Sequence, residues 1–276
     1  MLRSVRFIFA LVIAAVSLAT GNVARGDQPN KPSYLDGVGI DQNLGAQVPL
    51  DLVFHDEHGK EVKLGDFFDG NKKPVILTLI YYKCPDIQLC TLELNDLNRT
   101  MNGMSTLSAG DDYQVVTISF DPSEGPDLAL GKKEIYMQSY RRPHAAEGWH
   151  FLTGDAESIK KLTAAVGFRY KYDQKFQQYI HPNGLMVLTP KGAISRYFFS
   201  IDYDLKDLRL ALEEASGDKI GTVTDQILLY CFHYDPTTGK YSFRIIQFMQ
   251  LGAVLTMGAL GAFWFAMSRR ENPPSV

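Results

Sequence analysis

Two of the three cysteines in the sequence, Cys84 and Cys90, lie close together and directly after an apolar run. That run, VILTLIYY at 75–82, has no polar alternation, which is typical of a central strand covered on both faces. Leucine and methionine then recur at the spacing of an amphipathic helix. A thiol at the start of a helix ionises more easily, because unpaired N–H groups and the helix dipole stabilise the thiolate. A thiolate is a nucleophile and a soft metal ligand, so the stretch predicts thiol chemistry or metal binding.

The spacing of the two cysteines sets a geometric condition on both kinds of chemistry. In a continuous helix their six-residue offset would separate the Cα atoms by roughly 9 Å and place them on different faces. A disulfide needs about 4.4–6.8 Å. We therefore expect residues 85–88 to form a loop, with the helix starting near Leu89. A purely structural disulfide is a further interpretation, but closing so small a ring contributes only about 2.4 kcal/mol.

Alternating strands and helices would position this turn within a mixed α/β sheet that has helices on both faces. A hairpin with its turn at Gly59 is predicted over 51–64. Further strands are predicted at 113–120, 149–152, 168–172, 177–180, 185–188 and 193–199, and helices at 128–140, 155–166, 205–215 and 222–232.

Composition argues against one class of partner. The chain of 276 residues is 45% hydrophobic and 21% charged, which is enough apolar material for a sizeable core. Its formal net charge is −3, and no basic cluster with interleaved aromatic residues occurs in the sequence. We therefore expect no nucleic acid partner.

Both ends of the chain predict a relation to a membrane. Arg3 and Arg6 precede a mostly apolar run, and small residues follow it, as in an export signal over residues 1–26; an uncleaved anchor is the alternative. Residues 245–267 carry no charge and are numerous enough to cross a hydrocarbon core of about 30 Å. Arg269 and Arg270 follow this apolar stretch, as on the cytoplasmic side of a membrane span.

These segments predict one topology, in which the globular domain faces the periplasm or the cell exterior and is anchored at its C-terminal end. The expected parts are a signal peptide at 1–26, an extended lead-in at 27–47, the α/β domain at 48–216, a juxtamembrane helix and linker at 217–244, a transmembrane helix at 245–268 and a cytoplasmic tail at 269–276.

Four motifs resemble the Sco (SenC) family of thioredoxin-like proteins: YYKCP at 81–85, LCTL at 89–92, SFDP at 119–122 and HPNGLMVL at 181–188. The resemblance runs over roughly residues 37–236. It implies a thioredoxin-like fold and one copper ion, Cu(I) or Cu(II), bound by Cys84, Cys90 and His181. The family motif has three residues between its cysteines, whereas five separate Cys84 from Cys90 here.

Family members help to assemble the dinuclear copper centre of cytochrome c oxidase, and some act as thiol–disulfide reductants. The resemblance therefore implies a membrane-anchored copper chaperone, whose partner is the oxidase subunit that carries the copper centre. Two thiolates and an imidazole suit Cu(I) and accommodate Cu(II). The alternative is a thiol–disulfide oxidoreductase without copper, in which Cys84 attacks a disulfide and Cys90 resolves it.

Other polar residues carry weaker hypotheses. Asp121 either supports a bound ion from outside its ligand shell or is an ordinary carboxylate at a strand end, and both interpretations stay open. Cys231 lies in an apolar stretch and is expected to pack near the membrane. A solvated hairpin turn explains His55 and His58 better than a metal site does.

Overall fold

The computed structural model describes residues 35–84, 89–199 and 202–220, together with 234–235, 240–241 and scattered residues between 252 and 267. The chain divides into two compact units, Met1–Asp36 and Gly37–Val276. Only the last two residues of the first unit are described. The fold reported below is therefore that of the second unit.

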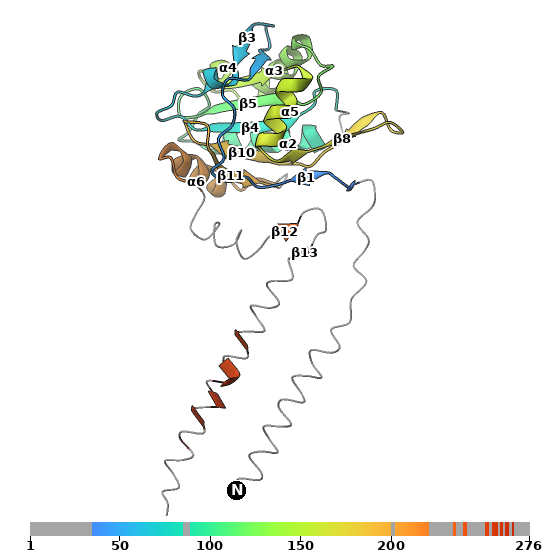
Figure 1. The fold of residues 1–276 in the computed structure, drawn as a ribbon. Coiled ribbons are helices and arrows are strands. Elements are labelled where there is room, and N and C mark those ends of the chain that lie inside the picture. Colours follow the sequence, from blue (N-terminus) through green and yellow to red (C-terminus); the bar gives the residue numbers. More distant parts are fainter. Residues whose placement is uncertain are drawn as a thin grey trace, which may run out of the picture. The chain divides into compact units, whose positions relative to one another are not determined.

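A five-stranded mixed sheet forms the centre of this unit (Figure 1). Its strands are β4 (Val75–Ile80), β5 (Gln114–Ser119), β6 (Trp149–Leu152), β10 (Leu185–Leu188) and β11 (Ile194–Phe198). They are ordered β11-β10-β4-β5-β6. β4, β5 and β6 run parallel, whereas β10 runs antiparallel to both β4 and β11. The predicted mixed sheet is confirmed.

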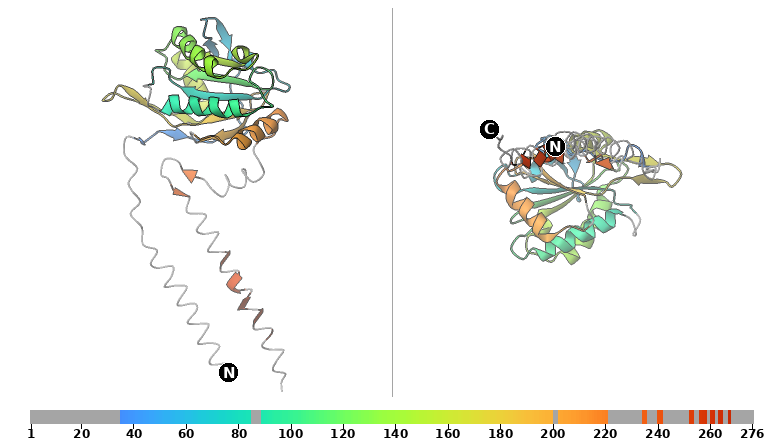
Figure 2. Two further views of the ribbon diagram at one scale, coloured as in Figure 1. Left: turned by 180° about the vertical axis from the view of Figure 1, so that it is seen from behind. Right: turned by 90° about the horizontal axis from the view of Figure 1, so that it is seen from below.

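β4 lies in the middle of the sheet, and all of its residues are buried. Its apolar run needs no alternation, because helices cover both faces. α2 (Leu89–Gly103), α3 (Pro126–Ser139) and α6 (Leu205–Ser216) lie on one face, and α5 (Ala156–Ala165) lies on the other (Figure 1 and Figure 2). The sheet therefore holds the residues that follow β4 inside a layered α/β domain.

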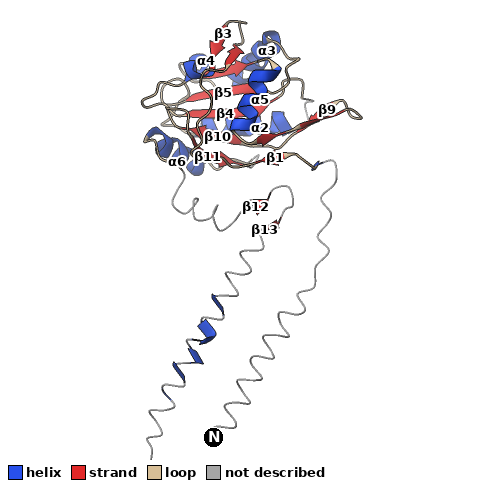
Figure 3. Cartoon of the chain, viewed as in Figure 1, coloured by secondary structure: helices blue, strands red, loops and turns tan. Residues whose placement is uncertain are grey.

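Short strand pairs surround the central sheet and appear in red in Figure 3. β2 (Val53–His55) and β3 (Glu61–Lys63) form the predicted hairpin. Its turn residue Gly59 has a φ of +78°, a conformation that side chains disfavour. β8 (Lys171–Asp173) pairs antiparallel with β9 (Gln178–Ile180). Other described elements are the 3-10 helix η2 (Leu64–Phe67), α4 (Ala145–Gly148), β12 (Tyr234–Asp235) and β13 (Lys240–Tyr241).

One predicted segment divides between two partners. Residues 168–172 are predicted as one strand, but only the end of this segment belongs to β8, which pairs with β9. β7 (Phe168–Arg169) instead pairs with β1 (Gly39–Ile40), which belongs to the predicted extended lead-in. The reason is long-range: Asp41 N–H also donates to the Gly167 carbonyl at 2.9 Å, so residues near 40 pack along this edge.

Several expectations fall on residues outside the described part of the chain. These are the signal peptide at 1–26, the helix at 222–232, Cys231 and the cytoplasmic tail. The predicted transmembrane helix at 245–268 is described only at scattered positions. Among the residues that the structure describes, no helix combines the length and the apolar character needed to cross a membrane.

Candidate metal centre

Cys84 lies in a tight turn at the end of β4. The Cys84 N–H donates to the Tyr81 carbonyl at 3.3 Å and closes a four-residue turn. Inside the domain, the Tyr82 hydroxyl donates to the Leu152 carbonyl at 2.7 Å and anchors the turn to the neighbouring strands. The Cys84 side chain is buried.

Cys90 lies in the first turn of α2, which begins at Leu89 as the cysteine spacing predicts. Residues 85–88, between the turn and the helix, lie outside the described part. The two cysteines form no disulfide in the described structure, and both side chains are buried. The end of β4 and the first turn of α2 therefore bring the two sulfur atoms together in one buried site.

His181 approaches the thiols from the segment between β9 and β10. Its Nε2 lies 3.2 Å from the Cys90 Sγ, and its Nδ1 lies 2.9 Å from the Pro182 carbonyl oxygen. Since a carbonyl only accepts, the ring proton is on Nδ1, which leaves the Nε2 lone pair facing the sulfur. A partner on the far nitrogen of this kind is typical of histidines that bind metals.

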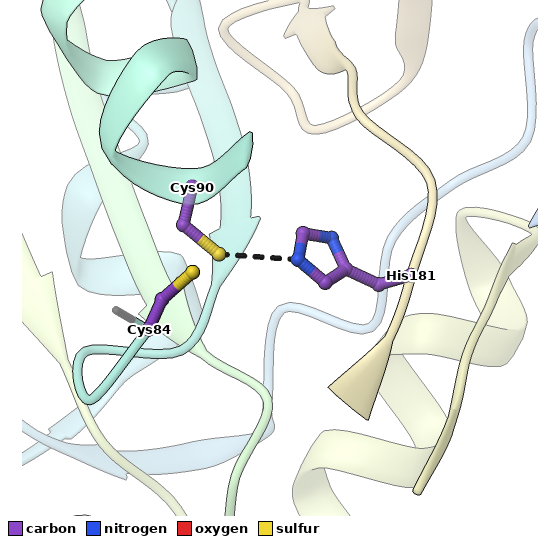
Figure 4. Close-up of side chains that lie close together, drawn as sticks. All are labelled: Cys84, Cys90 and His181. Atoms are coloured by element: carbon purple, nitrogen blue, oxygen red, sulfur yellow. Dashed lines mark hydrogen bonds between the residues drawn. The ribbon is translucent and has the colours of Figure 1, made fainter. Parts of the chain in front are cut away.

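The ligand atoms of Cys84, Cys90 and His181 all lie within 4.8 Å of one another (Figure 4). The two cysteine side chains point toward the imidazole from the opposite side of the site. Two sulfurs and one nitrogen form a soft donor set, which fits copper better than a hard cation such as Mg²⁺. The structure thus brings together the three residues predicted as ligands, although they come from separate segments.

Aromatic rings enclose the imidazole. The Tyr81 ring meets it edge-on, with centroids 5.7 Å apart and an interplanar angle of 90°. Phe120 and Phe168 flank it at centroid distances of 5.2 and 6.4 Å. These contacts restrict the rotation of the His181 ring, which is buried.

The two thiols titrate very differently. A hydrogen bond from Cys90 holds the pKa of Cys84 well below its ordinary value, with help from Tyr81, although burial opposes the shift. Burial raises the pKa of Cys90 well above its ordinary value, and the neighbouring Cys84 thiolate adds to the effect. These opposite pKa shifts correspond to one negative charge on the pair of sulfurs. Cys84 is therefore the thiolate of the pair at neutral pH.

Asp121 is not among the three clustered residues. Its carboxylate accepts a hydrogen bond from the Ser123 N–H at 2.9 Å, in the turn after β5. Burial first, and then the Asp121 charge, raise the pKa of Tyr179 to about 12. The Tyr179 ring in turn packs on Tyr81, at a centroid distance of 5.4 Å. Asp121 therefore interacts with Tyr179, whose ring packs on Tyr81 beside His181. A role of Asp121 in metal binding stays a prediction.

Sequence reasoning did not assign two buried carboxyl groups near the site. Glu124 bonds the backbone of the Cys84 turn, and its position after β5 gave no local signal. Glu93 lies one helical turn after Cys90 and is fully buried. Glu93 lies four positions before Leu97, on the buried stripe of α2. A charged residue on such a stripe is a signal that could have revealed this carboxyl group.

The sheet order, the flanking helices and the buried Cys–Cys–His cluster define a thioredoxin-like domain with a candidate metal centre. A family model described as SCO1/SenC matches residues 41–213. This match covers more than half of the chain, so the chain belongs to the SCO1/SenC family.

Solved structures share the fold. A protein from Aquifex aeolicus VF5, named as a candidate electron-transfer protein, is 28% identical with a TM-score of 0.55, over 63% of this chain and 95% of that chain. A SCO1/SenC family lipoprotein from Bacillus anthracis is 17% identical with a TM-score of 0.50, over 63% of this chain and 96% of that chain. No curated protein sequence matches the chain.

Proposed function

We propose that this chain is a membrane-anchored copper-binding chaperone of the Sco type. In this proposal it delivers copper to the dinuclear centre of cytochrome c oxidase, or prepares the thiols of that centre. The partner is the oxidase subunit that carries the centre. Copper, as Cu(I) or Cu(II), is the cargo rather than a permanent cofactor.

The observation that carries this proposal is the convergence of Cys84, Cys90 and His181 within 4.8 Å, inside a domain of the SCO1/SenC family. The wider spacing of the cysteines is compatible with this arrangement, because α2 begins only at Leu89. No disulfide joins the two cysteines, and the reduced pair is the state that binds copper. Oxidation to a disulfide would remove two electrons and the one remaining thiol proton, and it would abolish the site.

The proposed anchor is the apolar segment 245–268, with the α/β domain on the periplasmic or extracytoplasmic side. A tethered donor stays close to a membrane-embedded oxidase, so anchoring raises the effective concentration of the copper site near its partner. The predicted export signal at 1–26 supports the same orientation.

Copper stoichiometry on the reduced chain tests the proposal. We expect one copper per chain, and we expect Cys84→Ser, Cys90→Ser and His181→Ala each to lower Cu(I) affinity by about tenfold or more. His55→Ala, at an exposed hairpin position, is the matched control and should bind like the parent. Unchanged binding in His181→Ala would exclude the three-ligand site.

A second function, thiol–disulfide oxidoreduction without copper, is favoured by the opposite pKa shifts of the two thiols. Cys84 would attack a partner's disulfide, forming a mixed disulfide and releasing one partner thiolate. Cys90, after losing its proton, would then attack the Cys84 sulfur, forming the Cys84–Cys90 disulfide and releasing the second partner thiolate. Turnover that persists under copper chelation, with a trapped mixed disulfide in Cys90→Ser, would support this function. An unreactive Cys84 at neutral pH would exclude it.

A further inference from the structure

The buried carboxylate of Glu124 accepts hydrogen bonds from the backbone of the turn that carries Cys84. Glu124 Oε2 accepts the Tyr82 N–H, and Glu124 Oε1 accepts the Lys83 N–H, each at 2.6 Å. The Ser119 hydroxyl donates to Oε2 at 2.6 Å as well. Glu124 is only 5% exposed. Two successive backbone N–H groups and one hydroxyl thus converge on a single anion, in the manner of an anion-binding nest.

The turn depends on an acceptor outside itself. The Cys84 N–H bonds back to the Tyr81 carbonyl, which leaves the N–H groups of the two central residues without a partner inside the turn. A buried amide left without a hydrogen-bond partner is destabilising. Hydrogen bonds to a charged acceptor are about twice as strong as neutral ones. Glu124 therefore fixes the orientation of the backbone that leads into Cys84.

The hydrogen bonds to Glu124 also affect the positions of the ligand atoms. Cys84 directly follows Lys83, so a fixed peptide at Lys83 fixes the direction in which the Cys84 side chain leaves the backbone. Tyr81, at the start of the same turn, packs edge-on against the His181 ring. One carboxylate thus supports both a sulfur ligand and the contact that orients the imidazole.

We propose that Glu124 is a positioning residue of the metal centre, which holds the Cys84 sulfur in line with Cys90 and His181 through the backbone of the turn. It does not touch the ligand atoms in this role. The inference rests on the proposed function, because the position of Cys84 matters only if its sulfur binds copper or attacks a disulfide.

Glu57 provides a matched control. It is also 5% exposed, it forms a buried ion pair with Lys133, and it accepts the Phe151 N–H at 3.2 Å. Glu57→Gln and Glu124→Gln therefore each remove one buried carboxylate that binds a backbone amide. Only the second change lies at the Cys84 turn.

The test measures three quantities on the reduced full chain: the unfolding midpoint, the Cu(I) affinity, and the rate of Cys84 alkylation by iodoacetamide without metal, read by peptide mass mapping. We expect both variants to lower the unfolding midpoint. Glu124→Gln should also weaken Cu(I) binding by about tenfold and change the Cys84 alkylation rate by about threefold or more. Glu57→Gln should leave the last two quantities at parental values.

Equal effects of the two variants on copper and alkylation would reduce Glu124 to a packing role and overturn the inference, as would a Glu124→Gln variant that behaves like the parent. Glu124→Asp keeps the charge and should partly restore both quantities; it replaces Glu124→Gln if that variant does not fold. A parent chain that binds no copper would refute the proposed function, and the alkylation rate would still test Glu124.

Discussion

At the scale of single residues, the site places two coupled thiols beside one imidazole. The Nδ1 of His181 donates to the Pro182 carbonyl, so the Nε2 lone pair lies 3.2 Å from the Cys90 sulfur. Cys90 keeps its proton because of burial, and its hydrogen bond stabilises the Cys84 thiolate. A soft cation that replaces the Cys90 proton would meet two sulfurs and one nitrogen without rearrangement of the His181 tautomer.

Glu93 carries a prediction at this scale. Both of its oxygens are buried without a geometrically regular hydrogen bond. Burial raises its pKa well above the ordinary 4.5, although the Gly184 amide opposes the shift. A raised pKa in the folded state means that its stabilising contribution is complete below pH 4.5 and is lost as pH rises toward the folded value.

Glu93→Gln should remove this pH dependence, because the amide cannot ionise. We expect the variant to gain stability relative to the parent as pH rises above 4.5, by up to about 1.4 kcal/mol per pH unit. Denaturant unfolding of both metal-free, reduced proteins from pH 5 to pH 8 measures the difference. Glu213→Gln, on the surface of α6, should show no such trend, and a constant difference for Glu93→Gln would refute the prediction.

At the scale of elements, the segment between β9 and β10 sets the position of His181 relative to Cys90 in the first turn of α2. Gly184, just before β10, lies so close to β11 that an added Cβ would be 2.6 Å from the Phe198 carbonyl oxygen. The neighbouring backbone cannot move freely, because β10 pairs on both sides, with β4 and β11. A glycine is therefore needed at this position for close approach rather than for an unusual φ.

Gly184→Ala should displace the start of β10 and, with it, the His181 segment. We expect a loss of about 1–3 kcal/mol in the free energy of unfolding, the usual effect of overpacking, together with weaker Cu(I) binding. Gly131→Ala, in α3 where nothing lies within 4 Å of the added carbon, should instead stabilise the protein by about 0.5–1 kcal/mol and leave copper binding unchanged. Chemical denaturation and copper competition measure both variants; parental copper affinity in Gly184→Ala would contradict the prediction.

At the scale of the whole molecule, the domain acts as a scaffold that keeps a reactive pair of thiols buried. The turn after β4, the first turn of α2 and the β9–β10 segment meet at one place. Helices on both faces hold the sheet that carries them. The proposed anchor would also confine this site to the membrane surface.

Removal of residues 245–276 tests the anchor. We expect the shortened chain to move from the membrane fraction to the soluble fraction and to keep the copper stoichiometry of the full chain. Resistance of the full chain to extraction at alkaline pH, compared with that of the shortened chain, measures the change. If the shortened chain stays in the membrane, an uncleaved N-terminal segment is the anchor instead.

The sequence by itself determined the parts of this protein that depend on neighbours along the chain. The apolar run at 75–82 predicted a buried strand, the cysteine spacing predicted a helix start near Leu89, and Gly59 marked a hairpin turn. Hydrophobic periodicity and turn chemistry encode such features within a few residues. His181 was predicted only through the resemblance to a family, because a single histidine carries no pattern.

Tertiary structure alone decided the contacts that cross large sequence separations. Cys90 and His181 are 91 residues apart, and Glu124 lies 42 residues after the Tyr82 amide that it accepts. The pairing of Gly39–Ile40 with Phe168–Arg169 is of the same kind. No local pattern specifies these contacts, because their free energy comes from packing and charge burial that exist only once the sheet and its helices have assembled.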